Sequence, residues 1–150
     1  NRGHWSISLW DPAGDETVIR FGGPIHSLAI GPDAQLAVGG YRPQDGIQLW
    51  NGERFQRLDL DSDGPLFYHE VAFSADGAVV MGVSQHIPQQ GKTDQAILRA
   101  WDVSDGRLLM EVATEYGVQT AAFSPNAEQV LLASGNSLHE WVTPALVRTP

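Results

Sequence analysis

The sequence predicts an all-β protein built from repeated units of four short strands. Four tryptophans recur in similar contexts at intervals of 40, 51 and 40 residues. A second motif, in which an apolar run ends in a turn of Pro, Asp, Asn or Gly, recurs in step with them. No stretch has the length and periodicity of a long amphipathic helix. Two markers that stay in phase indicate an internal repeat. The four tryptophans are Trp10, Trp50, Trp101 and Trp141.

Each unit is expected to hold strands a, b, c and d in that order, with the tryptophan at the end of strand c. The first unit, residues 1–25, holds only c and d. The units at 26–65 and 66–117 hold all four strands, and the last unit, 118–150, holds a, b, c and a short d at Ala145–Arg148. Apolar, branched runs bounded by Gly or polar residues predict the b and d strands. These runs are Thr17–Phe21, Leu36–Gly39, Phe55–Leu60, Val79–Val83, Arg107–Ala113 and Val130–Ser134.

These residues resemble the WD-repeat β-propeller family, in which a Trp-Asp dipeptide closes strand c of a four-stranded antiparallel blade. The resemblance extends over nearly the whole chain and implies an incomplete ring of about three and a half blades, with strand a innermost. The family's Gly-His dipeptide before strand a is missing, and only Trp10 and Trp101 are followed by Asp. We therefore expect apolar packing between blades, with the four recurrent tryptophans in it, to hold the units together.

The first unit lacks strands a and b, so the resemblance implies an incomplete first blade. Unpaired strand edges with an apolar face are unstable or sticky in water. We expect residues upstream of this chain, or another polypeptide, to supply the remainder of the propeller. Trp5 lies five residues before Trp10, hence on the opposite face of the same strand. We expect it to be buried against that missing part.

The composition argues against several partners and sites. Nine Lys and Arg stand against 18 Asp and Glu, and a formal charge of −9 leaves no basic surface for nucleic acid or an anionic membrane. The chain has no cysteine, which excludes disulfides and thiolate zinc sites. No apolar run is long enough to span a bilayer. We expect a cytoplasmic protein, and the low lysine content with a bias toward Ala, Gly, Asp and Gln suggests a bacterial source.

Residues 59–70 fit the spacing of a calcium-binding loop. Asp59, Asp61 and Asp63 alternate along the loop, and Glu70 stands at its closing position. Such a site would make the chain a calcium-stabilised structural module. An EF-hand needs a helix on each side, whereas the flanking residues predict strands. We therefore favour an acidic, solvated connection, and expect no metal and no cofactor.

No catalytic motif stands out, and we expect the chain not to be an enzyme. The histidines form no helical pair, and no serine lies in a Gly-x-Ser-x-Gly turn. The alternative is a propeller-fold hydrolase or lyase with its site at the channel mouth. It would need carboxylates or histidines on the inner a strands, which read as apolar. Those strands contain Leu28–Ile30, Val71–Phe73 and Ala121–Phe123.

A face formed by loops is the candidate binding surface. The third unit owes its longer spacing to a connection at Ser84–Gln95. The resemblance to WD-repeat propellers implies that this connection stands beside the preceding b-to-c loop and the d-to-a connection. Aromatic residues and Arg among neutral polar ones are typical of interface centres. We predict a protein–protein interaction or sensing scaffold; a merely tolerated insertion is the alternative. The candidate binding residues are Tyr41, Arg42, Phe67, Tyr68, His86 and Lys92.

Overall fold

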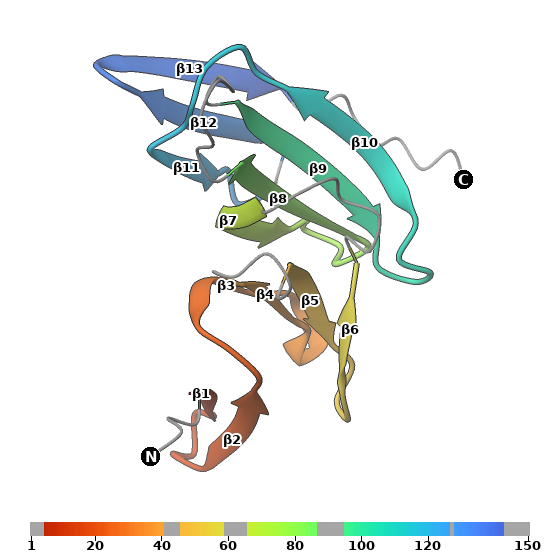
Figure 1. The fold of residues 1–150 in the computed structure, drawn as a ribbon. Helices are drawn as coiled ribbons and strands as arrows, with labels where there is room; N and C mark the ends of the chain where they lie inside the picture. The colour runs from red at the N-terminus through yellow and green to blue at the C-terminus, as the bar shows by residue number, and fades with distance from the viewer. Residues whose placement is uncertain (1–4, 41–45, 59–65, 87–94, 127, 143–150) are drawn as a thin grey trace.

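The computed structural model describes residues 5–40, 46–58, 66–86, 95–126 and 128–142. In these ranges the chain forms four antiparallel sheets, which follow one another in chain order from the bottom to the top of Figure 1. The helical structure in these ranges is one short 3-10 turn, η1 (Pro32–Ala34). The prediction of an all-β protein is confirmed.

Each sheet is a simple meander, because strands that are neighbours in the chain are also neighbours in space. Sheet A has two strands, β1 (Trp5–Trp10) and β2 (Glu16–Phe21). Sheet B has β3 (Ile25–Ile30), β4 (Leu36–Gly40), β5 (Ile47–Trp50) and β6 (Phe55–Arg57). Sheet C has β7 (Leu66–Phe73), β8 (Val79–His86), β9 (Ala96–Asp102) and β10 (Leu108–Ala113). Sheet D has β11 (Thr120–Phe123), β12 (Gln129–Ser134) and β13 (Ser137–Val142).

Strands β7 and β8 extend further than the sequence predicted. The residues from Leu66 to Tyr68, predicted as a connection, belong to β7, and β8 continues past Ser84 to His86. Leu66 pairs with His86 and Tyr68 with Ser84. The pairing continues because Tyr68 and Ser84 are buried, so their backbone polar groups need partners within the sheet. The predicted strand at Ala145–Arg148 lies outside the described residues.

One row of apolar side chains crosses three strands and recurs in three sheets. In sheet B, Ile30 lies opposite Leu36, and Leu36 lies opposite Trp50. Cross-strand partners share a face of the sheet, so the row presents its side chains together. The repeat seen in the sequence is therefore also a repeat of strand register. The corresponding rows are Phe73, Val80 and Trp101 in sheet C, and Phe123, Val130 and Trp141 in sheet D.

The tryptophan of each row packs against the preceding sheet. Trp50 lies against the core residues of sheet A, and Trp141 against those of sheet C. Trp101 is only 2% exposed and packs against sheet B. The prediction of tryptophans in the core between units is wrong for Trp10, which is 67% exposed because no described residues form a sheet before sheet A. Trp5 is also exposed, although it lies on the same face of β1 as Ile7, which packs toward sheet B. Its burial against a further part of the propeller stays a prediction.

Sheets B and C close on one another around Tyr68. Its side chain is 0% exposed, and its ring centroid lies 6.3 Å from that of Trp101. The hydroxyl of Ser27 in sheet B donates to the carbonyl oxygen of Tyr68 at 3.4 Å. A Cβ at Gly82 would lie 2.9 Å from a ring carbon of Tyr68, and one at Gly39 would lie 2.8 Å from its Cβ. The two glycines therefore make room for this ring.

Replacing Gly39 by alanine is expected to destabilise the chain by about 1–3 kcal/mol, since the new methyl group would overlap Ser27 and Tyr68. Gly22→Ala is the matched control, because nothing lies within 4 Å of a Cβ at that position. Urea unfolding of both variants measures the difference. Equal midpoints would show that the contact between sheets B and C is loose enough to absorb a methyl group.

Trp101→Ala is expected to cost about 3–5 kcal/mol, as is usual for removing a large buried aromatic residue. Trp10→Ala removes the same side chain from the corresponding position of sheet A, where it is exposed, and should change the free energy of unfolding by about 0.5 kcal/mol or less. Thermal and denaturant unfolding of the two variants provide the comparison. Similar losses from both would contradict the described packing of the tryptophan rows.

Candidate functional site

The strand ends that would carry the predicted loop face lie close together. His26, near the start of β3, and His69, in the middle of β7, have ring centroids 5.9 Å apart. The last residue of β4 pairs with Ile25, and the last residue of β8 pairs with Leu66. Strands β4 and β8 therefore end on the same side of sheets B and C.

Tyr68 corrects the predicted binding surface. It was expected in an exposed connection, but it lies in β7 with its side chain buried between sheets B and C, where no partner can reach it. Phe67 and His86, also expected in connections, belong to β7 and β8 by their backbone. The other three predicted binding residues lie outside the described residues: Tyr41, Arg42 and Lys92.

The sequence interpretation missed a polar cluster at this end of the sheets. Nε2 of His69 lies 2.9 Å from Oε1 of Gln85, and the ring of His26 approaches from β3. A register shift between Tyr68 and Glu70 places His69 at an irregular position in β7. His26 and His69 hold the same place before the turn motif in successive units. This repeated position is the sequence feature from which the cluster could have been predicted. The inner strands are thus less apolar than predicted.

Burial disfavours the charged forms of His69 and Glu70. Burial lowers the pKa of His69 below the usual 6.5; the hydrogen bond with Gln85 acts in the opposite direction, and the neighbouring His26 lowers the pKa further. Burial also raises the pKa of Glu70 above the usual 4.5, against the effect of its backbone hydrogen bond. A neutral His69 donates its Nε2 proton to Gln85, and its other ring nitrogen is an acceptor. The cluster is suited to neutral hydrogen bonding.

The predicted calcium loop is described only at its closing residue. Glu70 lies in β7, opposite Val83, and its raised pKa disfavours the charged form that a cation needs. Asp59, Asp61 and Asp63 lie outside the described residues. Within the described ranges, no three His, Asp or Glu side chains are grouped so that they could hold a metal ion.

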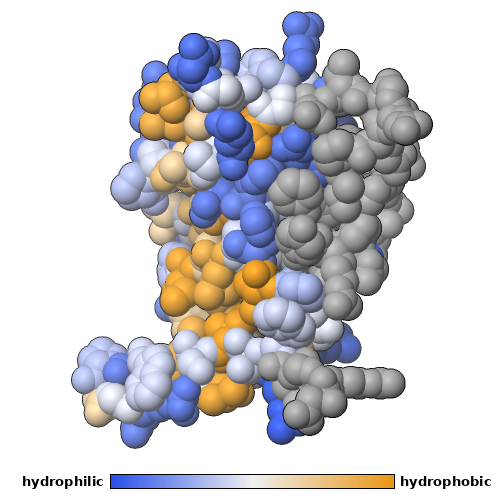
Figure 2. Space-filling model, turned by 60° about the vertical axis from the view of Figure 1, so that its left-hand side comes forward, coloured by the Kyte–Doolittle hydropathy of each residue, from blue (hydrophilic) through white to orange (hydrophobic). Residues whose placement is uncertain are grey.

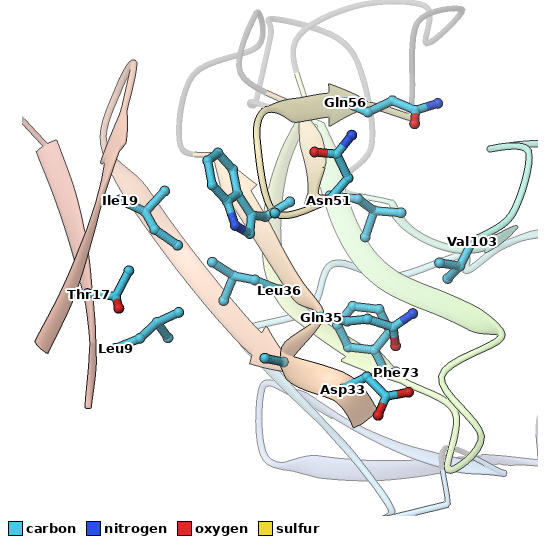
Figure 3. A pocket seen from close by; sticks show the side chains of 14 residues that line it. Leu9, Thr17, Ile19, Asp33, Gln35, Leu36, Asn51, Gln56, Phe73 and Val103 are labelled. Carbon is cyan, nitrogen blue, oxygen red and sulfur yellow. The ribbon is translucent and has the colours of Figure 1, made fainter. Parts of the chain in front are cut away.

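A cavity of about 470 Å³ lies at the opposite end of the strands. Figure 3 shows Leu9 and Ile19 of sheet A on one side of it and Leu36 of sheet B on the other. Gln35 Nε2 donates to the carbonyl of Gly77, and Asn51 Oδ1 accepts backbone N–H groups of the turn that follows it. Gln35 Oε1 is buried and has no hydrogen-bond partner among the described residues. The cavity has mainly apolar walls, with Asp33, Gln35 and Asn51 among the polar residues that line it.

Each of the end sheets exposes large apolar side chains on its outer face. They alternate with residues that pack inward, so they point away from the neighbouring sheet. Figure 2 shows hydrophobic residues at the surface in the middle and lower parts of one view of the molecule. Soluble monomers seldom expose large contiguous apolar patches, which more often mark interaction sites. These residues are Trp10 and Val18 on sheet A, and Leu131, Leu138 and Val142 on sheet D.

The pKa of His69 gives a testable pH dependence. In the unfolded chain His69 has its usual pKa near 6.5. As the pH falls, it therefore binds a proton at a higher pH in the unfolded chain than in the folded chain. The stability of the folded chain should therefore be constant above that pH and decrease as the pH falls through 6.5 toward the lowered pKa. His69→Gln should remove this part of the decrease.

Urea unfolding between pH 7.5 and pH 5 measures this effect, with about half a pH unit between points. The His26→Gln variant retains the burial of His69 and its contact with Gln85, so it should keep most of the decrease. An identical pH profile for the native chain and His69→Gln would contradict the described environment.

Among the described residues, no helix combines the length and the hydropathy needed to cross a membrane. A scan of the chain against protein-family models finds no match, and a search of curated proteins finds none either.

Proposed function

We propose that this chain is a segment of a WD-repeat-like β-propeller that serves as a non-catalytic scaffold for protein–protein interaction. The observation that carries the proposal is the recurrent apolar row. Through this row, each of sheets B, C and D packs against the sheet that precedes it in the chain. Large apolar side chains such as Trp10 and Leu138 are exposed on sheets A and D, and exposed apolar patches often mark interaction sites.

The arrangement of the inner strands supports a propeller. Strand β7 contacts β3 on one side and β11 on the other, so the first strands of sheets B, C and D are neighbours. A series of meanders whose first strands adjoin is the arrangement that radial repetition around an axis requires. The outer faces of sheets A and D are then the positions at which further sheets would pack.

The strand ends near His26 and His69 support a second binding region. Connections that leave one side of adjacent sheets are the usual place for recognition on a rigid scaffold. The proposed contact residues there are Tyr41, Arg42, Phe67, His86 and Lys92. The hydrogen bond between His69 and Gln85 would help to hold these strand ends in place as part of the scaffold.

Site-specific photo-crosslinking in the source cell tests the proposal. A photoreactive amino acid at Trp10 and, separately, at Leu138 should give covalent adducts with protein at several times the yield obtained at Asp105. Asp105 is the matched control, because it is exposed in a polar turn between β9 and β10. Equal yields at all three positions would contradict a scaffold that works through its sheet faces.

A second variant separates the sheet faces from the loop face. Replacing Tyr41, Arg42, His86 and Lys92 together by serine should leave the unfolding midpoint nearly unchanged and reduce partner capture at the loop face. Pull-down of the crosslinked partners from cells expressing each variant makes the comparison. Undiminished capture would remove the loop face from the proposal and leave the sheet faces.

A further inference from the structure

An asparagine–glycine dipeptide, Asn51–Gly52, lies in the turn between β5 and β6. Of the four asparagines in the chain, only Asn51 is followed by glycine. Both residues are exposed, and nothing lies within 4 Å of the position that a Cβ would take at Gly52. The turn is therefore accessible to water and hydroxide, and no side chain shields the peptide bond between the two residues.

Two backbone donors hold the side-chain carbonyl of Asn51. The N–H groups of Glu53 and Arg54 donate to its Oδ1 at 3.0 and 2.9 Å. Donors placed in this way stabilise the negative charge that develops on a carbonyl oxygen when a nucleophile attacks its carbon. Among the described residues, the N–H of Gly52 makes no hydrogen bond. The nitrogen of Gly52 is therefore available as that nucleophile.

We infer that Asn51 is a site of spontaneous deamidation in the folded chain. Hydroxide removes the N–H proton of Gly52, and the nitrogen attacks Cγ of Asn51 to close a succinimide ring. The bond from Cγ to Nδ2 breaks, and Nδ2 takes a proton from water and leaves as ammonia. Water then opens the ring, at Cγ to leave aspartate or at the main-chain carbonyl to leave isoaspartate. The net reaction consumes one water, releases one ammonia and involves no oxidation or reduction.

The aspartate product fits the turn. In sheets A and C the residues in the corresponding place are already aspartates, Asp11 and Asp102. Oδ1 of Asp11 accepts the N–H of Asp15 at 2.9 Å, and Oδ1 of Asp102 accepts that of Ser104 at 2.8 Å. A carboxylate in the turn between β5 and β6 accepts backbone N–H groups in the same way, so conversion to aspartate leaves this turn intact.

The isoaspartate product disturbs the turn, because it adds a methylene group to the main chain between two paired residues. Trp50 pairs with Phe55 across the turn, and their ring centroids lie 5.0 Å apart. The ring of Phe55 also lies 5.0 Å from that of Phe21 in sheet A. Isoaspartate at this position therefore weakens the contact through which sheet A is attached to sheet B.

Incubation of the folded chain at about pH 8 and about 37 °C, followed by mass analysis of its peptides, tests the inference. The peptide that contains Asn51 should gain the mass difference between a carboxyl and an amide group, about tenfold or more faster than the peptide that contains Asn126. Asn126 is the internal control, because its Oδ1 also accepts a backbone N–H, from Glu128 at 3.2 Å. The next residue there is Ala127, whose Cβ hinders ring closure. The rate at Asn51 should decrease as the pH is lowered, since the attacking nitrogen must first lose its proton.

Two comparisons make the result specific. Gly52→Ala places a Cβ beside the attacking nitrogen and should slow the loss of ammonia, whereas Gly22→Ala, at another open position, should leave the rate unchanged. The chain unfolded in urea measures the reaction without the turn. Equal rates at Asn51 and Asn126 would overturn the inference. So would an unchanged Asn51 in the folded chain over a period in which the unfolded chain reacts.

Thermal unfolding of the separated products tests the structural consequence. The isoaspartate form should melt at a lower temperature than the fresh chain, and the amide hydrogens of residues 5–10 and 16–21 in sheet A should exchange faster in it. Asn51→Asp is the matched control and should leave the melting temperature nearly unchanged. Equal melting temperatures for the isoaspartate form and Asn51→Asp would overturn the effect on sheet A.

Discussion

Face-to-face packing between successive sheets is the interaction on which the rest of the molecule depends. A half-buried meander with apolar residues on both faces needs a neighbour on each side to keep them from water. Sheet C has both neighbours, and its strands β8 and β9 are accordingly buried almost throughout. Sheets A and D have one neighbour each. The exposed tryptophan of sheet A and the apolar outer strand of sheet D follow from that single constraint.

Much of the fold could be predicted because the same register recurs. The tryptophan spacing located the third strand of each unit, and the alternating apolar runs located its neighbours. The extent of β7 and β8 could not be predicted, because Tyr68, Ser84 and Gln85 resemble loop residues by composition. They are strand residues because the two sheets close over them, which is a tertiary effect that local pattern does not contain.

The candidate site was predictable as a location and less so in its chemistry. The resemblance implied that the relevant strand ends share one side of adjacent sheets, and β4 and β8 do end on the same side, whereas a binding site there stays a prediction. Tyr68 was wrongly taken for a surface aromatic residue, since an aromatic ring serves equally in a core or at an interface. The neutral pair of His69 and Gln85 depends on a local irregularity in β7, which no period-two pattern could show.

The serial arrangement of the sheets has a consequence for how the molecule loses its structure. When each unit is stabilised mainly by the units beside it, cooperativity decays with distance along the series, and the ends fray first. Sheet A has two strands and one neighbouring sheet, so its local unfolding should need the least free energy. Sheet C should be the last to unfold. A protein that docks on an end sheet would therefore act as a clamp, raising the resistance to proteolysis of the strands beneath it and not only of those it touches.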